Sequence, residues 1–286
     1  MPEAVRLAPA ITVDVEDWPQ SSWDRSLPIT QRAADNTRRM LDLFARLNVR
    51  VTLFVLGKFA EAFPDVVRRM EREGHEVACH GYGHEEVFKQ SREHFSQDVR
   101  RAKSLLEDLV GRPVVGYRAP DFSILPGSFW AFEVLSELGF AYDSSMFPIR
   151  ARRYGVPEWP LHPTRLRLAS GTDLMEFPIS VVRLAGRNWP LGGGGYQRLL
   201  PGWAFRWLSD RVMQERLFVL YCHPYEFDHR EFAHLPFDIP LSVRLHQGLG
   251  RRFVPARMER FIARFGSQPL NALLTPGTFP DFVPPA

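Results

Sequence analysis

Two histidines stand four residues apart around a pair of glycines, in the run His80-Gly-Tyr-Gly-His84, directly after an apolar stretch. Imidazole nitrogens are common ligands of divalent metals. Two of them, joined by one carboxylate from elsewhere in the chain, would bind a metal and leave positions open for water. The pair therefore predicts a metal site, whereas the isolated His75 and His94 are expected to be structural.

Carboxylates stand near the start of the chain, where the apolar run 11–13 predicts a buried strand that leads into Asp14-Val15-Glu16-Asp17. Three acids at a strand end are costly unless something positive lies beside them. Strand alternation would place Glu16 on the same side as Asp14, whereas a turn after the strand would present Asp17. Either acid could therefore complete a metal site.

Two further predicted strands also end in polar residues. The run 113–117 leads into Arg118-Ala-Pro120-Asp121, and the run 217–222 leads into His223. In a barrel of alternating strands and helices, the carboxyl ends of the strands gather on one face, where such folds carry their chemistry. Acids, histidines and an arginine from residues 14 to 223 are therefore expected to converge.

The elements that would position these residues alternate along the chain. Apolar residues at helical spacing predict helices over 33–47, 59–73, 95–110 and 128–138. Short β-rich runs at 51–56, 75–79, 114–115 and 140–142 separate them. This alternation is typical of an α/β fold with a parallel sheet. With 286 residues, of which 45% are hydrophobic, one domain suffices. We expect a motif-bearing barrel over about 10–224, followed by a loop, helix and tail over 225–286.

The second half is less regular, with a Pro- and Arg-rich stretch over 149–168, a buried strand over 174–179 and a glycine run over 192–195. Long loops on a rigid scaffold tend to shape substrate grooves. Aromatic residues in or beside them would suit stacking on sugar rings, with core packing as the equal alternative: Trp159, Trp189, Tyr196 and Trp203.

Composition narrows the class of protein. The net charge of +3 is mild and the basic residues are scattered, so nucleic-acid binding is not indicated. No apolar run approaches the length of a membrane span and the first ten residues lack the pattern of a signal peptide, so a soluble, cytoplasmic protein is expected. Cys79 and Cys222 each precede a candidate site histidine and would face the opposite side of their strands. We expect buried thiols rather than ligands or a disulfide.

In order and spacing, five motifs resemble those of the NodB-homology polysaccharide deacetylases, carbohydrate esterase family 4. The resemblance covers roughly residues 11–224 and rests on these motifs: Thr12-Val-Asp14 with Glu16-Asp17, His80-Gly-Tyr-Gly-His84, Arg118-Ala-Pro120, Tyr142-Asp143-Ser144 and Leu220-Tyr-Cys-His223. Within this family the chain looks closest to the deacetylases associated with exosortase and exopolysaccharide gene clusters. That likeness rests on the opening Asp-Val-Glu-Asp-Trp, the Glu176-Phe-Pro178 segment, the Gly-Gly-Gly-Tyr196-Gln-Arg198 loop and the run His223-Pro-Tyr-Glu226-Phe-Asp228.

The resemblance implies a distorted (β/α) barrel of seven or eight strands and hydrolysis of the N-acetyl groups of an amino-sugar glycan. It implies that Asp14 is the general base, that His80 and His84 bind the metal, and that His223 is the general acid. Arg118 would pair with Asp14, and Asp143 would help to set the state of His223. The metal would be zinc, with cobalt or nickel as alternatives. The partner would be an N-acetylated polysaccharide or its precursor in exopolysaccharide synthesis.

Three positions depart from the usual pattern of this family. Val15 separates Asp14 from the next acids, and we favour Asp17 as the third ligand because a short carboxylate is the usual type, with Glu16 as the alternative. Asp121, after Pro120, stands where many members have an aromatic residue, which would either alter the substrate platform or place a further acid in the site. Gly81 replaces a hydroxyl residue, so a side chain that would orient the metal ligands is missing.

We expect Tyr82, Pro120, Asp121, Trp189 and Tyr196 to contact the substrate. Two other functions stay open at this point: an amidohydrolase acting on a cyclic imide or ureide, and a non-catalytic sugar-binding protein. An open cleft lined by Trp159, Trp189 or Tyr196 would favour a glycan, and a closed pocket a small substrate. The full set of acids and histidines argues against a protein that only binds, because binding alone needs no acid and base around a metal.

Overall fold

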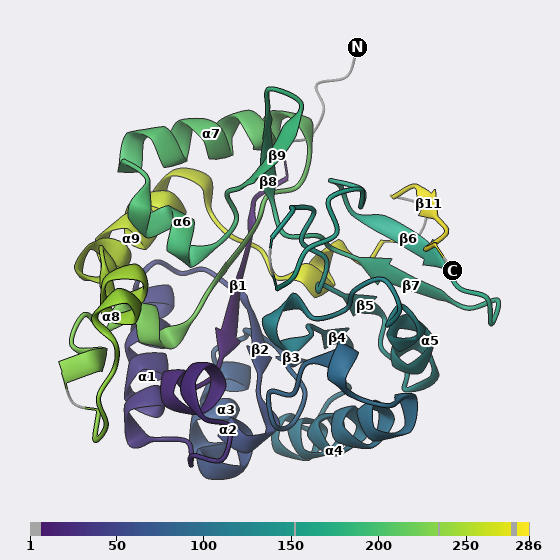
Figure 1. Ribbon diagram of the computed structural model, residues 1–286, viewed down its shortest axis with the longest axis horizontal. Helices are drawn as coiled ribbons and strands as arrows, with labels where there is room; N and C mark the ends of the chain where they lie inside the picture. The colour runs from purple at the N-terminus through teal and green to yellow at the C-terminus, as the bar shows by residue number, and fades with distance from the viewer. Residues whose placement is uncertain (1–6, 152, 234, 276–278, 286) are drawn as a thin grey trace.

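The computed structural model describes residues 7–151, 153–233, 235–275 and 279–285. Its centre is a mostly parallel sheet with helices packed around it (Figure 1). The strands follow the order β10 (Val219–Cys222), β1 (Ala10–Val15), β2 (Thr52–Val55), β3 (Glu76–Cys79), β4 (Gly116–Tyr117), β5 (Tyr142–Asp143), β7 (Asp173–Glu176), β6 (Thr164–Arg167) and β11 (Asp281–Phe282). The pairs from β10 to β7 are parallel, and β6 runs antiparallel to β7. The expected α/β class is confirmed.

The sheet is open in its strand-to-strand hydrogen bonding, because β10 and β11 stand at the two ends of the order given by the described residues. Loop contacts partly span the gap between β5 and β10. Ile179 N donates to Met146 O at 2.9 Å, and Ser180 N donates to Val219 O at 3.2 Å. Closure into a full barrel stays a prediction.

The helices of the first half largely fall where the apolar spacing predicts them: α1 (Gln31–Arg46), α2 (Gly57–Ala62), α3 (Pro64–Arg72), α4 (Arg92–Val110) and α5 (Trp130–Glu137). Helix α4 shows why its sequence ends where it does. Ser91 Oγ accepts from His94 N at its start, and Gly111 adopts a φ of 68° at its end, a left-handed conformation that suits glycine. The single helix expected over 59–73 is two helices, because Pro64 cannot donate a helical hydrogen bond and instead starts α3.

The second half contains elements that the pattern does not predict. The hairpin of β8 (Val181–Leu184) and β9 (Arg187–Pro190) forms a separate two-stranded sheet. The helices are α6 (Gly194–Leu199), α7 (Gly202–Glu215), α8 (Leu241–Gly248) and α9 (Val254–Phe265). Short turns complete the list: η1 (Pro19–Trp23), η2 (Val87–Lys89), η3 (Pro120–Phe122), η4 (Pro224–Phe227), η5 (Glu231–Ala233), η6 (Arg251–Phe253) and η7 (Leu270–Leu273).

The main hydrophobic core joins both halves of the chain. It runs from Ile11 on β1 to Phe261 on α9, and Phe261 packs against Phe205 of α7 and Phe218. Cys79 and Cys222 are free and buried, as expected. Among the described residues, no helix combines the length and apolar character that a membrane crossing requires. The C-terminal helix α9 thus belongs to the same core that supports the carboxyl ends of β1, β3 and β10.

Candidate active site and metal centre

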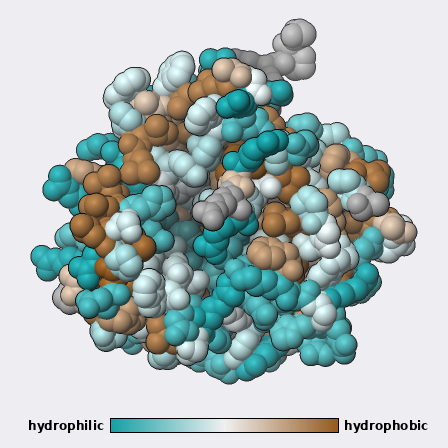
Figure 2. Space-filling view, in the orientation of Figure 1, coloured by the Kyte–Doolittle hydropathy of each residue, from teal (hydrophilic) through white to brown (hydrophobic). Residues whose placement is uncertain are grey.

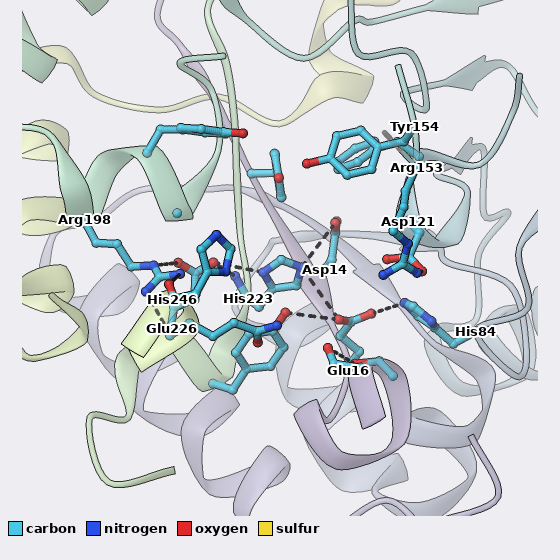
Figure 3. Close-up of a pocket in the computed structure, with 18 of the residues that line it drawn as sticks. Asp14, Glu16, His84, Asp121, Arg153, Tyr154, Arg198, His223, Glu226 and His246 are labelled. Atoms are coloured by element: carbon cyan, nitrogen blue, oxygen red, sulfur yellow. Dashed lines mark hydrogen bonds and ion pairs between the residues drawn. The ribbon is translucent and has the colours of Figure 1, made fainter. Parts of the chain in front are cut away.

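The predicted chemistry-bearing residues converge on one cavity of about 290 Å³ (Figure 3). Asp14 and Glu16 come from the end of β1, His80 and His84 follow β3, and His223 follows β10. In the parallel sheet β10 lies next to β1, and only β2 separates β1 from β3, so the carboxyl ends of these strands meet. The expected convergence of residues 14 to 223 is therefore observed.

Glu16, His80 and His84 form the one group of side chains among the described residues whose ligand atoms could hold a metal, with those atoms within 4.8 Å of one another. Glu16 Oε2 lies 2.7 Å from His84 Nε2 and 3.4 Å from His80 Nε2. All three residues are buried.

The closeness of Glu16 and the histidines shifts their pKa values. Burial raises the pKa of Glu16, but the two histidines outweigh that effect and hold it well below its usual range. Burial lowers the pKa of His84, but Glu16 raises it above its usual value.

The orientation of His80 makes this cluster a candidate metal site rather than an ordinary ion pair. His80 Nδ1 lies 2.9 Å from the carbonyl oxygen of Arg118 and donates to it. In the neutral form of this ring, Nε2 carries a lone pair that faces a carboxylate oxygen of Glu16. Two acceptors at this distance repel each other unless a proton or a metal lies between them. A carbonyl that fixes the tautomer of a ligand histidine is the usual arrangement in metal centres.

The loop between the histidines depends on backbone conformations that few residues adopt. Gly81 has a φ of 72° and His84 a φ of 64°. Asp98 Oδ2 accepts from Tyr82 N at 2.8 Å and would lie 3.1 Å from a Cβ at Gly81. Asp98 therefore holds this loop from outside, while the Arg118 carbonyl orients His80. The hydroxyl that is missing at Gly81 is not needed for either contact.

The choice of Asp17 as third ligand is wrong in this structure. The Asp17 carboxylate accepts from Thr30 N at 2.6 Å, at the start of α1, and burial raises its pKa to about 6. Strand β1 continues to Val15 in extended form, so Glu16 keeps the side of the sheet that Asp14 occupies. The chain turns only after Glu16, and that turn carries Asp17 away from the histidines. Glu16, the alternative, lies beside both histidines instead.

Asp14 is held on one side by a buried arginine. Arg118 Nη1 donates to Asp14 Oδ1 at 2.7 Å and to Thr12 Oγ1 at 2.8 Å. The other donors of this fully buried guanidinium bind the carbonyl oxygen and the hydroxyl of Ser144, each within 2.9 Å. Because Arg118 holds Oδ1, the second oxygen of Asp14 faces the cavity, 4.0 Å from His223 Nε2.

Glu226, and not Asp143, orients His223. His223 Nδ1 lies 2.9 Å from Glu226 Oε1, and the His223 ring stacks on Tyr225 at 4.6 Å between centroids. Burial lowers the pKa of His223, but Glu226, Glu16 and Asp14 outweigh it and raise the pKa to about 9. The expectation for Asp143 is wrong, because its carboxylate accepts from Ser145 N at 2.9 Å and Ser145 Oγ at 2.6 Å.

The sequence motifs assign Glu226 no role, although a local signal for its contact with His223 is present. An acid three residues after a histidine, with a proline between them, can fold back over the histidine in one tight turn. Turn η4 has this form, and Glu226 Oε1 also accepts a hydrogen bond from His223 N at 3.2 Å. The glycine run explains how Glu226 is confined. A Cβ at Gly194 would lie 2.3 Å from Glu226 Oε1, and one at Gly192 would lie 2.3 Å from Val219 O. Only glycines let this loop pack so closely against β10 and η4.

Of the residues expected to contact substrate, Asp121 and Tyr196 line the cavity. Tyr82 instead donates to Glu61 Oε2 at 2.6 Å and lies under the Arg101 guanidinium at 3.6 Å, outside the cavity lining.

The other expectations for substrate contacts also differ from the structure. Pro120 is buried at the start of η3 and supports Asp121 without lining the cavity. Trp189 is 53% exposed on β9, away from the cavity lining. Trp159, a possible groove residue, is buried in the core against Phe129, Phe132 and Phe282.

These contacts allow a defined chemistry. A carboxylate oxygen of Asp14 and an imidazole nitrogen of His223 face each other across the cavity, with the Glu16 cluster beside them. A base, an acid and a set of metal ligands around one cavity are suited to adding water to a carbonyl and protonating the leaving group.

Comparison with known proteins agrees with this chemistry. Residues 11–142 match a family described as polysaccharide deacetylase, and residues 144–275 match a domain of unknown function (DUF3473). The chain is 33% identical over 98 residues to a peptidoglycan-N-acetylglucosamine deacetylase of Bacillus cereus, covering 34% of this chain and 36% of that protein. It is 32% identical over 110 residues to a peptidoglycan deacetylase of Helicobacter pylori, covering 38% of this chain and 36% of that protein. The chain thus spans about a third of the length of these curated relatives.

A solved structure shares the fold across nearly the whole chain. The putative polysaccharide deacetylase from Mycobacterium smegmatis superposes with a TM-score of 0.64 at 22% identity, covering 96% of this chain and 91% of that chain. At this identity the likeness shows the fold alone. The sequence matches, by contrast, include β1, β3 and β4, which carry Asp14, the two histidines and Arg118.

Proposed function

We propose that this protein removes N-acetyl groups from an amino-sugar glycan in a metal-dependent reaction. The premise is that the sequence matches support the polysaccharide deacetylase family and a hydrolase of the deacetylase type. The observation that carries the proposal is the close pair His80 Nε2 and Glu16 Oε2, 3.4 Å apart in a buried site, with His84 completing a group whose ligand atoms could hold a metal. His223 and Asp14 stand beside this pair in the same cavity.

The residues present fit a divalent metal. Glu16, His80 and His84 supply one carboxylate and two imidazoles, a donor set suited to zinc and related ions. Glu16 Oε2 is buried, with His84 Nε2 at 2.7 Å and His80 Nε2 at 3.4 Å, so either protons on these nitrogens or a cation must satisfy it. When bound there, a divalent metal supplies a Lewis acid that polarises the amide carbonyl and makes water more acidic. We propose zinc, with cobalt or nickel able to replace it.

The residues of the chain would carry the protons. Asp14 Oδ2 would accept a proton from the attacking water, since Arg118 binds the other oxygen of that carboxylate. A bond would form between the water oxygen and the acetyl carbon. His223 Nε2 would then donate a proton to the amide nitrogen as the carbon–nitrogen bond breaks, which releases acetate and a free amine. A pKa of about 9 keeps His223 in the protonated form that this step needs at neutral pH.

The wall of the cavity suits a sugar ring. Its lining includes the rings of Tyr154, Tyr196 and Tyr221 and the polar side chains of Asp121 and Arg153. Aromatic faces beside hydrogen-bonding groups are the usual surroundings of a bound sugar. The likeness of the runs Asp14–Trp18, Glu176–Pro178 and His223–Asp228 to deacetylases of exosortase-associated clusters supports an N-acetylated exopolysaccharide or its precursor as the substrate.

The test is acetate release from N-acetylglucosamine oligosaccharides by the purified protein loaded with zinc or cobalt. The wild type should release acetate and free amines in equal amounts. Asp14→Asn should lose most of the turnover while it keeps its metal, because it removes the base but none of the three ligands. Normal turnover in Asp14→Asn would remove Asp14 from the role of base.

A further inference from the structure

Five large apolar side chains are exposed on helices α6 and α8, directly after α8 and on turn η6: Leu199, Leu241, Leu245, Leu249 and Phe253. We call this set the apolar rim. Its exposed fractions range from 45% for Phe253 to 69% for Leu241. Helix α8 has no buried residue, and its leucines recur every four residues, so they lie along one face of the helix. An isolated exposed leucine needs no explanation, but a row of them does.

Three members of the rim lie close together. Leu199, Leu249 and Phe253 line one hollow, together with Arg252 and Arg257. Figure 2 shows hydrophobic residues gathered along the left margin of the molecule, over the position of α8 and α9 in Figure 1. Helix α7, which contacts α6, adds two exposed tryptophans four residues apart, Trp203 and Trp207. Exposed tryptophan and leucine beside basic residues are characteristic of surfaces that meet a lipid bilayer.

Positive charge predominates in the segment that carries most of the rim. Residues 241–265 contain six arginines and a single acid, Glu259, whereas the whole chain carries a net charge of only +3. Arg244 and Arg252 are exposed beside the rim leucines, and the Arg252 guanidinium lies 4.4 Å from the ring of Phe253. This combination of arginines and leucines complements an anionic surface with an apolar interior.

The rim is held rigidly beside the catalytic cavity. Arg198 Nη1 donates to the carbonyl oxygens of Gln247 at 2.7 Å and Leu249 at 2.9 Å, and Arg251 Nε donates to Gln247 O at 2.7 Å. His246 and Gln247, on the same helix as the rim leucines, line the cavity, as does Leu199. The same two elements, α6 and α8, therefore form both a wall of the cavity and the exposed rim.

We propose that the apolar rim docks this protein onto the surface of an anionic lipid bilayer, with the catalytic cavity at the edge of the contact. A second copy of the chain fits the rim less well, because a twofold contact would bring the arginines of residues 241–265 against their own copies. A bilayer supplies both an apolar layer for the leucines and phosphate groups for the arginines. Peripheral docking needs no membrane-spanning helix.

The test is sedimentation of the full-length protein with vesicles of phosphatidylcholine alone or of phosphatidylcholine mixed with phosphatidylglycerol. The wild type should bind the mixed vesicles and release them as salt is raised. Leu241→Ser with Leu245→Ser should weaken binding by roughly tenfold or more, because both side chains lose their burial in lipid. Arg244→Gln with Arg252→Gln should weaken binding to the mixed vesicles by roughly thirtyfold, since each arginine near the surface contributes about 1 kcal/mol.

The control is Phe88→Ser, which removes an exposed apolar side chain beside Lys89 and outside the rim, and which should bind vesicles like the wild type. All variants should keep the melting temperature of the wild type, because the altered side chains are exposed. Equal vesicle binding by wild type and rim variants, or no binding to the mixed vesicles, would overturn the proposal. So would a wild-type dimer that the leucine variant converts to a monomer, since the rim would then bind a second copy.

Discussion

Replacing Glu226 by glutamine should shift the pH dependence of catalysis. The substitution keeps an oxygen that can accept from His223 Nδ1 but removes the negative charge that now lies 2.9 Å from that nitrogen. The pKa of His223 is raised from 6.5 to about 9, a stabilisation of its protonated form by about 3 kcal/mol. Glu226 is the first of the groups that raise it, followed by Glu16 and Asp14. Loss of the Glu226 charge should therefore lower the pKa of His223 by about one unit.

The direction of the effect follows from the role of His223 as the acid. A histidine with a raised pKa is protonated below that pKa and loses its proton as the pH rises through it. The alkaline limb of kcat should have its midpoint near pH 9 in the wild type and about one pH unit lower in Glu226→Gln. At half a unit above the wild-type midpoint, the variant should be roughly eightfold slower, whereas near neutral pH the two rates should be similar.

The assay is acetate release across the pH range at saturating substrate and metal. Asp143→Asn is the matched control, because it also neutralises a buried acid at a strand end but one that contacts Ser145 and not His223. Its alkaline limb should stay where the wild-type limb lies, even where its stability falls. An unshifted limb in Glu226→Gln, or a shifted one in Asp143→Asn, would refute this account of how His223 is oriented and charged.

Three further predictions follow from the same contacts. Gly194→Ala should lower kcat strongly, because its Cβ would lie 2.3 Å from Glu226 Oε1 and displace that carboxylate; a wild-type kcat would show that the close approach is unimportant. Trp159→Ala should destabilise the protein by about 3–5 kcal/mol in denaturant unfolding, with little change in KM, because Trp159 is buried in the core. Tyr196→Ala should instead raise KM with little loss of stability, because Tyr196 lines the cavity. The reverse pattern would show that Trp159 contacts the substrate. His75 is buried and its pKa is lowered to about 4, so the unfolded chain takes up its proton first and stability should fall as the pH drops from about 6.5 towards 4. His75→Asn should make the unfolding free energy fall less steeply as the pH drops, and the whole contribution of this one group is at most about 3 kcal/mol. An unchanged slope of unfolding free energy against pH would contradict the lowered pKa of His75.

The sequence predicts the convergence of the site because one rule suffices for it. Parallel strands bring their carboxyl ends to one edge, so any polar residue that directly follows a strand is a candidate. His80, Arg118 and His223 satisfy this rule, and Asp14 lies one residue before the end of β1. The helix boundaries of the first half follow equally local signals, such as Ser91 before α4 and Gly111 after it.

The choice between Glu16 and Asp17 shows where such local reasoning fails. Strand alternation alone favours Glu16, and a preference for the shorter carboxylate moved the prediction to Asp17. The deciding fact is where the chain turns, and that depends on the start of α1, where Thr30 N binds Asp17. This contact joins residues 13 positions apart and has no signature in the local pattern.

Long-range packing accounts for the remaining errors. Trp159 is buried because Phe282, more than a hundred residues later, covers it. The leucines of α8 follow the same four-residue spacing as a core helix, yet the structure leaves them exposed. Hydrophobic periodicity tells which residues share a face of a helix, but not whether another element lies against that face.

The most direct test of the metal centre is the metal content per chain, measured by elemental analysis after zinc is supplied and excess is removed. The wild type and Asp17→Ala should each hold close to one metal ion, whereas Glu16→Ala and His80→Ala should hold little. Retention by Glu16→Ala with loss in Asp17→Ala would contradict the ligand set. A wild-type protein that takes up neither zinc nor cobalt would contradict the proposed metal-dependent hydrolysis as a whole.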